Sequence, residues 1–314
     1  MTPLAAAILA VLPCVYWTQP IDTRAALEAA GITRLCVAPE QVAAWKAAGF
    51  TATPIAVEDL AMRDALVAPG VAPRPGVASP TRSPWINANG WRFIRKPQGK
   101  YAYDVPAGKA ALAAAEAFAY GADAVLKIDH ADIGAAGAML RFLSSLDTID
   151  LPVIADIAVI DDGTPITGEV MNLLSRRNLL FQVVPKATPE WRIAIAVGSS
   201  QYPAEEAANP SAFAQKIRRE LGDERRALRV YGSEVVLCRV TGDRTRARLH
   251  LLNYGGRDIE GLRIKLRGTY ASGTATVFGA GGLPLDELVA GDGATEFSVP
   301  RLTAYAVIDL QSAK

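Results

Sequence analysis

The feature that most constrains the fold is a change in hydrophobic periodicity near residue 225. Before that point, short apolar segments alternate with alanine-rich helical segments, and from Ala227 onward apolar and polar residues alternate with a period of two. Strands that alternate with helices pair in parallel, whereas period-two strands separated by tight turns pair in antiparallel hairpins. The chain is therefore expected to be an α/β protein that continues into an antiparallel β domain.

The first two-thirds of the chain contain eight candidate strands with helical patterns between most of them. Eight such units predict a (β/α)8-like, possibly degenerate barrel over residues 14–222, for which about 200–250 residues suffice. Only residues 185–192 separate the last two strands, which leaves no room for a helix, so a shorter open sheet is the alternative. The predicted strands are residues 14–17, 34–37, 51–56, 76–78, 124–128, 153–160, 180–184 and 193–197.

Residues 227–314 are predicted to form an antiparallel β-sandwich domain, because Gly- and Asp-containing turn signals interrupt the alternation at hairpin intervals. The segment 216–267 contains 14 basic and 7 acidic residues. Many of these arginines alternate with apolar residues, so we expect them on a solvated sheet face. A surface for an acidic ligand is the alternative.

Composition restricts the possible cofactors and partners. Lys and Arg number 33 and Asp and Glu 32, so the chain as a whole does not attract nucleic acid. Two histidines, and three cysteines without a Cys-x-x-Cys pair, indicate neither a metal site nor a disulfide framework. No nucleotide, dinucleotide, esterase or zinc-protease motif lies at a strand–turn–helix position. We therefore expect no cofactor and no metal, with carboxylates, arginines and aromatic residues as the working groups.

The N-terminal segment has two interpretations. Residues 4–12 form an apolar run of nine residues, far short of the roughly 20 that span a bilayer. Residues 1–13 are predicted to be either a secretion signal or the start of the first strand. The first would place the mature protein outside the cytoplasm, secreted or periplasmic, and the second would leave it cytoplasmic. No other segment is a candidate membrane span, and the oligomeric state stays open.

Carboxylates follow two consecutive predicted strands. Asp129 ends the strand 124–128, and Asp161 and Asp162 end the strand 153–160. Catalytic groups of a (β/α)8 barrel come from the C-terminal ends of its strands. Two carboxylates at neighbouring strand ends are the arrangement that glycoside hydrolysis needs. We therefore predict that Asp129 and either Asp161 or Asp162 form the catalytic pair, one as acid and the other as nucleophile or base. The alternative is that these aspartates cap the helices that follow.

A long polar insertion, residues 79–106, separates the fourth and fifth predicted strands. Its aromatic rings could stack on sugar rings while its Asn and Arg side chains bind hydroxyl groups, although rings packed against one another over the barrel rim are the alternative. A carbohydrate is thus the expected ligand. The predicted substrate-binding residues are Trp17, Gln19, Arg82, Trp85, Asn87, Asn89, Trp91, Lys127 and His130.

The segment Leu126-Lys127-Ile128-Asp129 is similar to the Lys-x-Asp strand of the α-galactosidase clan of glycoside hydrolases. The layout of an α/β barrel followed by a β-sandwich also resembles that of many glycoside hydrolases. The resemblance implies that Asp129 is the nucleophile. The acid/base aspartate of that clan lies two strands later, whereas Asp161 and Asp162 lie one strand later. The chain also resembles bacterial proteins of the same barrel-like kind, for which the family supplies no activity.

Three functions are therefore compared. The first is a carbohydrate-active hydrolase that cleaves glycosidic bonds. The second is a non-catalytic carbohydrate-binding or cell-surface protein with an enzyme-like fold, which the missing helix between the last strands favours. The third is an open flavodoxin-like sheet with residues 156–164 as its switch-point loop, like the amidotransferase-like domains attached to some glycosidases. Such a domain would be inert, because no cysteine follows a strand there.

Overall fold

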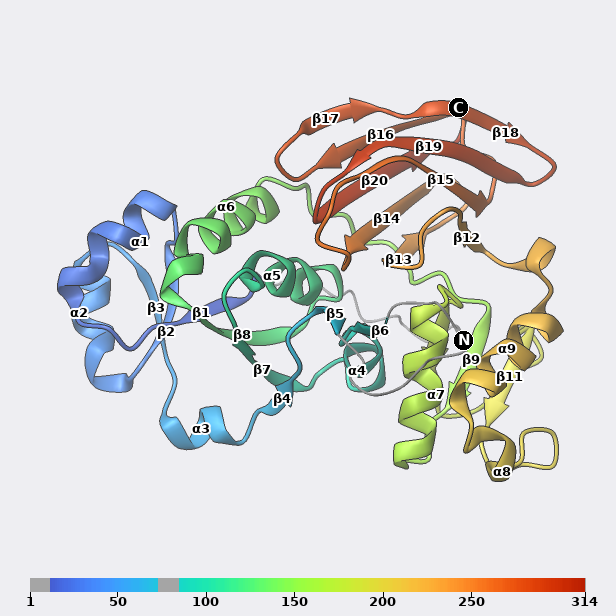
Figure 1. Cartoon of the computed structure of the whole chain (residues 1–314), viewed down its shortest axis with the longest axis horizontal. Coiled ribbons are helices and arrows are strands. Elements are labelled where there is room, and N and C mark those ends of the chain that lie inside the picture. The colour runs from blue at the N-terminus through green and yellow to red at the C-terminus, as the bar shows by residue number, and fades with distance from the viewer. Residues whose placement is uncertain (1–11, 73–84, 314) are drawn as a thin grey trace.

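The computed structural model of the chain describes residues 12–72 and 85–313. Two parallel sheets with their helices form one part of the molecule, and two antiparallel sheets built from the last third of the chain form the other (Figure 1). The predicted strand 76–78, Arg82 and residues 1–11 lie outside the described residues. Among those described, no helix is both long and apolar enough to cross a membrane.

The larger parallel sheet has six strands, and each pair of neighbours is parallel. Strands β1, β2 and β3 run in chain order from the middle of the sheet to one edge. Strands β4, β7 and β8 run in chain order from the opposite edge to the middle, where β8 pairs with β1. This order is that of a barrel opened between its third and fourth strands. From edge to edge the strands are β3 (Thr51–Pro54), β2 (Arg34–Val37), β1 (Cys14–Tyr16), β8 (Asp123–Ile128), β7 (Lys100–Val105) and β4 (Asp64–Leu66).

A separate three-stranded parallel sheet has the order β10 (Phe181–Val183), β9 (Ile157–Ile160), β11 (Ile193–Ala196). In the part of the chain that the structure describes, no strand pairing joins it to the six-stranded sheet, so the (β/α)8 barrel is not closed. The residues before β9 explain the separation. Ile154 N–H donates to the Val240 carbonyl, which ties this segment to the C-terminal sheets instead of leading it alongside β8.

Helices α1, α2, α4, α5 and α6 pack in the core on one face of the six-stranded sheet. Val15, Leu35 and Leu126 of the strands share a core with Leu27 of α1 and Trp45 of α2. On the opposite face, hereafter the open face, a small core holds Cys36, Ala102 and Val125 with Leu60 of α3. The helices are α1 (Arg24–Ala30), α2 (Val42–Ala47), α3 (Val57–Ala61), α4 (Gly90–Arg95), α5 (Ala110–Ala119), α6 (Ile133–Ser144), α7 (Pro165–Arg176), α8 (Ala204–Ala207) and α9 (Pro210–Leu221).

The last third of the chain is antiparallel, as its period-two pattern predicted. Its two sheets share a core that includes Leu249, Ile264, Phe297 and Ile308. The five-stranded sheet has the order β13 (Val236–Gly242), β14 (Arg246–Asn253), β20 (Tyr305–Gln311), β16 (Ser272–Val277), β17 (Gly281–Pro284), and the four-stranded sheet β12 (Leu228–Val230), β15 (Ile259–Arg267), β19 (Ala294–Leu302), β18 (Asp286–Gly291).

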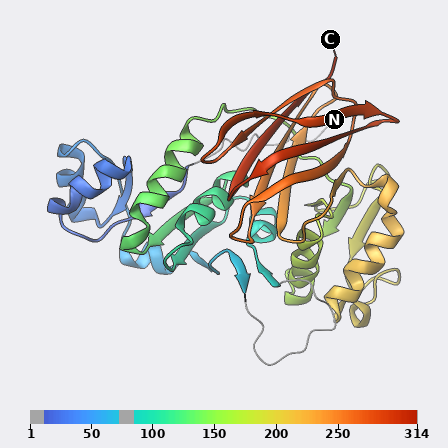
Figure 2. The same cartoon turned by 45° about the horizontal axis from the view of Figure 1, so that its top comes forward.

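Helices α5 and α6 lie between the six-stranded sheet and the five-stranded sheet (Figures 1 and 2). Leu252 and Tyr305 of the five-stranded sheet belong to the same core as the alanines of α5, whose small side chains permit close approach. This sheet is therefore buried on both faces. The expected solvated face is wrong for Arg248 of β14, which is only 6% exposed, and the neighbouring His250 is 9% exposed.

The structure also contains a disulfide bond that the cysteine spacing did not indicate. Cys14 of β1 and Cys36 of β2 are bonded, with their Cα atoms 5.7 Å apart. The two residues are 22 positions apart in sequence, and they meet because β1 and β2 are parallel neighbours. Cys238 is free and buried.

Candidate functional site

The open face carries polar side chains near the C-terminal ends of its central strands. The strand register places Tyr16 of β1 beside Lys127 of β8, and Lys127 beside Asp104 of β7. Successive side chains of a strand point to opposite faces. Because Leu126 and Tyr103 point into the helix-covered core, Lys127 and Asp104 point to the open face. Tyr16 and Lys127 are half-buried there, and Asp104 is exposed.

Asp129 lies two residues after Lys127, directly beyond the end of β8. Its backbone is extended, with φ −65° and ψ 144°, so its side chain leaves the strand on the same face as Lys127. The exposed carboxylate accepts one hydrogen bond from Ala131 N–H at 2.8 Å and caps the 3-10 turn His130–Asp132. Strands about 4.8 Å apart with a rise of about 3.3 Å per residue place the Cα atoms of Asp104 and Asp129 roughly 8 Å apart.

Trp17 and His130 meet at the same end of the sheet because they follow the neighbouring strands β1 and β8. Their ring centres are 5.7 Å apart. Trp17 is only 4% exposed, and its indole N–H donates to the Thr23 hydroxyl at 3.0 Å. Its ring therefore belongs to the core, whereas His130 and Gln19 are exposed.

Asp161 follows β9 and is held by an arginine of the insertion. The Arg95 guanidinium donates two hydrogen bonds to its carboxylate, at 2.8 and 2.7 Å. These bonds lower the pKa of Asp161. Asp162 accepts hydrogen bonds from the N–H and hydroxyl of Thr164, the residue that caps α7. Partial burial opposes the ionisation of Asp162, but the hydrogen bonds outweigh it and lower its pKa.

The structure does not bring Asp129 together with Asp161 and Asp162. Asp129 follows a strand of the six-stranded sheet and the other two follow a strand of the three-stranded sheet (Figure 1). A general acid needs a proton near neutral pH. The lowered pKa values of Asp161 and Asp162 leave both groups ionised.

The described part of the insertion is folded, contrary to the long irregular loop that we expected. It forms β6 (Trp85–Asn87), which pairs with β5 (Gly70–Ala72), and then α4 and β7. Trp91 packs in the core beneath α7, and the Arg176 guanidinium lies 3.8 Å from the centre of the Trp85 ring. Both rings are therefore engaged within the protein. Asn87 is half-buried at the end of β6.

Asn89 belongs to a buried polar network rather than to an open surface. Its backbone and side-chain N–H groups donate to the two carboxyl oxygens of Glu116, at 2.6 and 3.0 Å. The hydroxyls of Tyr103 and Tyr254 also bond this carboxyl group. Burial raises the pKa of Glu116. The network joins α4, β7, α5 and the end of β14, and it is closed to a substrate.

Sequence reasoning missed Asp104 and Tyr16. The segment Tyr101-Ala102-Tyr103-Asp104-Val105 alternates like a strand, but the polar residues that precede it favour its assignment to the insertion. Within the described ranges, no group of three or more His, Cys, Asp or Glu residues could hold a metal ion.

No protein-family model matches the sequence, and no curated protein matches it either. Among solved structures, the chain resembles α-L-fucosidase isoenzyme 2 from Paenibacillus thiaminolyticus, with a TM-score of 0.53 and 10% identity over 69% of this chain and 61% of that one. It also matches a rhamnosidase from Novosphingobium sp. PP1Y, with a TM-score of 0.44 and 10% identity over 68% of this chain and 31% of that one.

The likeness to the fucosidase confirms a glycoside-hydrolase-like fold, the class of fold that the layout and the Lys-x-Asp strand suggested. The chain spans less than two-thirds of the fucosidase chain, and at 10% identity the likeness concerns the fold alone. What the site does must therefore be argued from its own residues.

Proposed function

We propose that the chain is a carbohydrate-active hydrolase whose substrate binds against the open face, with Asp129 as the nucleophile. The observation that carries this proposal is the diagonal placement of Asp104 and Asp129 on adjacent strands, on one face, at the strand ends. A Cα separation of roughly 8 Å lets the two carboxyl groups take the ~5–9.5 Å spacing that hydrolysis by paired carboxylates uses.

Lys127 and Tyr16 complete this site. Lys127 lies opposite Asp104 in the strand register and two residues before Asp129, so its side chain is on the same face of the sheet as both aspartates. Tyr16 offers a ring edge and a hydroxyl on the other side of Lys127. We assign the acid/base role to Asp104, because Asp161 and Asp162 are ionised and held by Arg95 and Thr164.

A non-catalytic carbohydrate-binding protein is the second candidate. The opening between β3 and β4 favours it, because a substrate on the open face is less enclosed than in a closed barrel. In either case we propose that the protein is secreted or periplasmic. The Cys14–Cys36 disulfide supports this location, because disulfides persist in oxidising compartments.

The test is hydrolysis of a panel of aryl α- and β-glycosides by the wild type and by Asp129→Asn, Asp104→Asn and Asp162→Asn, all with unchanged circular dichroism. Loss of about 100-fold or more in kcat with the first two variants, against a near-normal Asp162→Asn control, is expected. An equal loss in Asp162→Asn would return the acid/base role to that residue. No turnover of any glycoside, with saccharides still bound, would establish the second candidate.

A further inference from the structure

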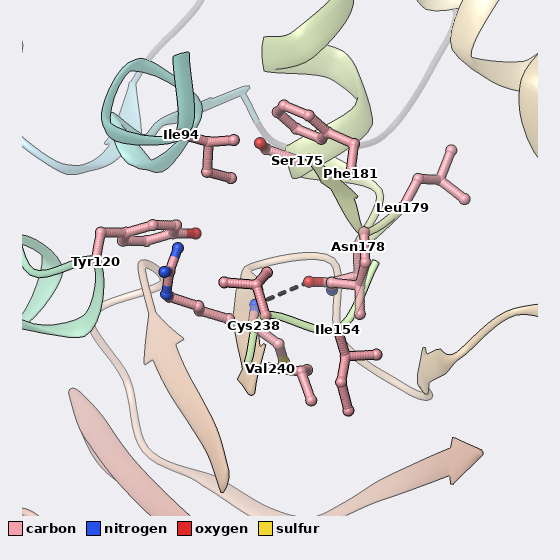
Figure 3. Close-up of a pocket in the computed structure, with 12 residues that line it drawn as sticks. Ile94, Tyr120, Ile154, Ser175, Asn178, Leu179, Phe181, Cys238 and Val240 are labelled. Atoms are coloured by element: carbon pink, nitrogen blue, oxygen red, sulfur yellow. Dashed lines mark hydrogen bonds between the residues drawn. The ribbon is translucent and has the colours of Figure 1, made fainter. Parts of the chain in front are cut away.

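The apolar cavity where α4, α5, β10 and β13 converge is too small for an organic ligand. Its volume of about 30 Å³ has space for about two water molecules. Ile94, Phe181 and Val240 reach it from different elements and nearly fill it (Figure 3). A further ligand contact lies instead at the C-terminal end of the six-stranded sheet.

Lys109 stands at this end of the sheet without an anionic partner. It follows β7 by four residues and directly precedes α5. Its side chain is half-buried, and within the described residues its ammonium forms neither an ion pair nor a hydrogen bond. The nearby Asp132 does not supply a counter-charge, because its carboxylate accepts the backbone N–H groups of residues 108–110. The ammonium is therefore available to an anionic group of a ligand.

The Lys109 ammonium lies against the hairpin of β5 and β6. Its nitrogen is 2.6 Å from the point that a Cβ at Gly70 would occupy. Gly70 is opposite Asn87 in the register, and opposite residues of an antiparallel pair project to the same side, with Cβ atoms about 4.5–5.5 Å apart. Asn87 is half-buried, and its side chain makes no hydrogen bond to another described residue. The Asn87 amide and the Lys109 ammonium thus stand together on one side of the hairpin.

This hairpin borders the strand ends that carry the two aspartates of the proposed active site. β4 is the parallel neighbour of β7, and β5 begins at Gly70, four residues after β4 ends. Asp104 lies near the end of β7, and Asp129 follows β8. The loops after β7 and β8 touch, since Lys109 N–H donates to the Asp132 carboxylate at 3.1 Å. Lys109 therefore lies at the rim of the active site, on the side of β4.

The charges of this site favour an anionic substrate during catalysis. Lys109 and Lys127 are cationic, and Asp104 and Asp129 balance them when both are ionised. Hydrolysis by paired carboxylates requires one of the two to carry a proton as the general acid. In that state two ammonium groups face one carboxylate, so a net positive charge attracts an anionic substrate.

We propose that the substrate is an acidic sugar whose carboxylate or sulfate group binds the Lys109 ammonium, while one of its hydroxyls binds the Asn87 amide. This inference rests on the proposed hydrolase function and names its substrate class. Lys109 is then the residue that distinguishes an acidic sugar from a neutral one, and Asn87 is a contact that both kinds of sugar share.

The test is calorimetric titration of the full chain with uronic acids and with their amides, which differ from the acids in charge. Glucuronate and galacturonate are compared with glucuronamide and galacturonamide, and the 6-sulfates of glucose and galactose with the neutral sugars. At least one acidic sugar should bind about tenfold more tightly than its neutral counterpart, and whether it is a uronate or a sulfate identifies the acidic group.

Lys109→Met keeps the aliphatic stem and should remove this preference. Lys100→Met, the same change at an exposed lysine at the opposite end of β7, should retain it. Asn87→Ala should weaken acidic and neutral sugars alike, because both offer hydroxyls to the amide.

Equal affinity for acidic and neutral sugars would overturn the inference and leave the hydrolase proposal standing. A preference that persists in Lys109→Met would also overturn it. If no sugar of the panel binds at millimolar concentration while the wild type still hydrolyses aryl glycosides, the acidic substrate alone is wrong. If neither binding nor hydrolysis occurs, the proposed function fails together with the inference.

Discussion

Arg95 holds Asp161 in a two-pronged ion pair, with Nε 2.8 Å from one carboxylate oxygen and Nη2 2.7 Å from the other. Arg95 ends α4 and Asp161 follows β9, so the pair links the folded insertion to the three-stranded sheet. The side chains are 15% and 20% exposed. The pair therefore anchors two parts of the fold to each other.

Asp161→Asn should lower the free energy of unfolding by about 1–3 kcal/mol at pH 7, because it removes charge-assisted hydrogen bonds. The Arg95 bonds lower the pKa of Asp161. Their stabilisation is therefore present above the ordinary pKa near 3.8 and is lost as the pH falls through the lowered pKa. Urea unfolding at pH 7, 5 and 3 measures the difference in free energy of unfolding between wild type and Asp161→Asn. This difference should shrink only at pH 3. A difference that is the same at all three would contradict this.

Glu116→Gln should destabilise the protein by about 1–3 kcal/mol. Asn89 donates to both carboxyl oxygens, so either orientation of a glutamine sets its NH2 group against a donor. Because burial raises the pKa of Glu116, the folded protein holds this proton more tightly than the unfolded chain does. The resulting contribution to stability is fully present below the ordinary pKa of 4.5 and is lost as the pH rises through the raised pKa. The advantage of wild type over Glu116→Gln in urea unfolding should thus be larger at pH 4 than at pH 8. Tyr254→Phe, which keeps the carboxyl group, serves as the matched control.

Asp132→Ala should cost about 1–3 kcal/mol of stability without changing ligand binding. The buried carboxylate of Asp132 accepts the backbone N–H groups of Gly108, Lys109 and Ala110, and so caps α5 from the end of β8. Asp129→Ala removes a single exposed N–H bond and should cost less than about 1 kcal/mol. Thermal unfolding of the two variants side by side measures the difference, and equal losses would refute the capping role.

Local pattern predicted the elements whose residues repeat regularly. The strand expected at 124–128 is β8, the alanine-rich segment 107–120 contains α5, and the alternating last third is antiparallel. Pattern did not predict which strands are neighbours. β9 is separated from β8 because residues 152–154 pair with β13, more than 80 positions later, and no local signal encodes such a pairing.

The sequence predicted a residue of the candidate site only where that residue lies on a strand or helix with a regular hydrophobic pattern. Asp129 could be placed at the end of β8, but Asp104 belongs to β7, which the polar residues around it concealed. Asp161 looked available in the sequence because its partner Arg95 stands 66 residues earlier. The packing of the insertion tryptophans likewise depends on α7, which follows far along the chain.

His250 should make stability fall with acidification. Burial and the nearby cations Arg239 and Arg248 lower the pKa of His250 to about 3, and its ring nitrogen bonds the Tyr305 hydroxyl at 2.6 Å. Between its ordinary pKa of 6.5 and about 3, the unfolded chain binds a proton that the folded chain excludes, so stability is lost as the pH falls through this window.

The expected loss from this residue between pH 6.5 and 4.5 is about 2–3 kcal/mol. His250→Gln, which can still bond Tyr305, should remove that part of the pH dependence. Urea unfolding of both proteins at half-unit intervals of pH measures the two slopes. Because other groups titrate equally in both proteins, the difference between the slopes isolates His250. Parallel curves would mean that the ring is protonated inside the fold as readily as in the unfolded chain.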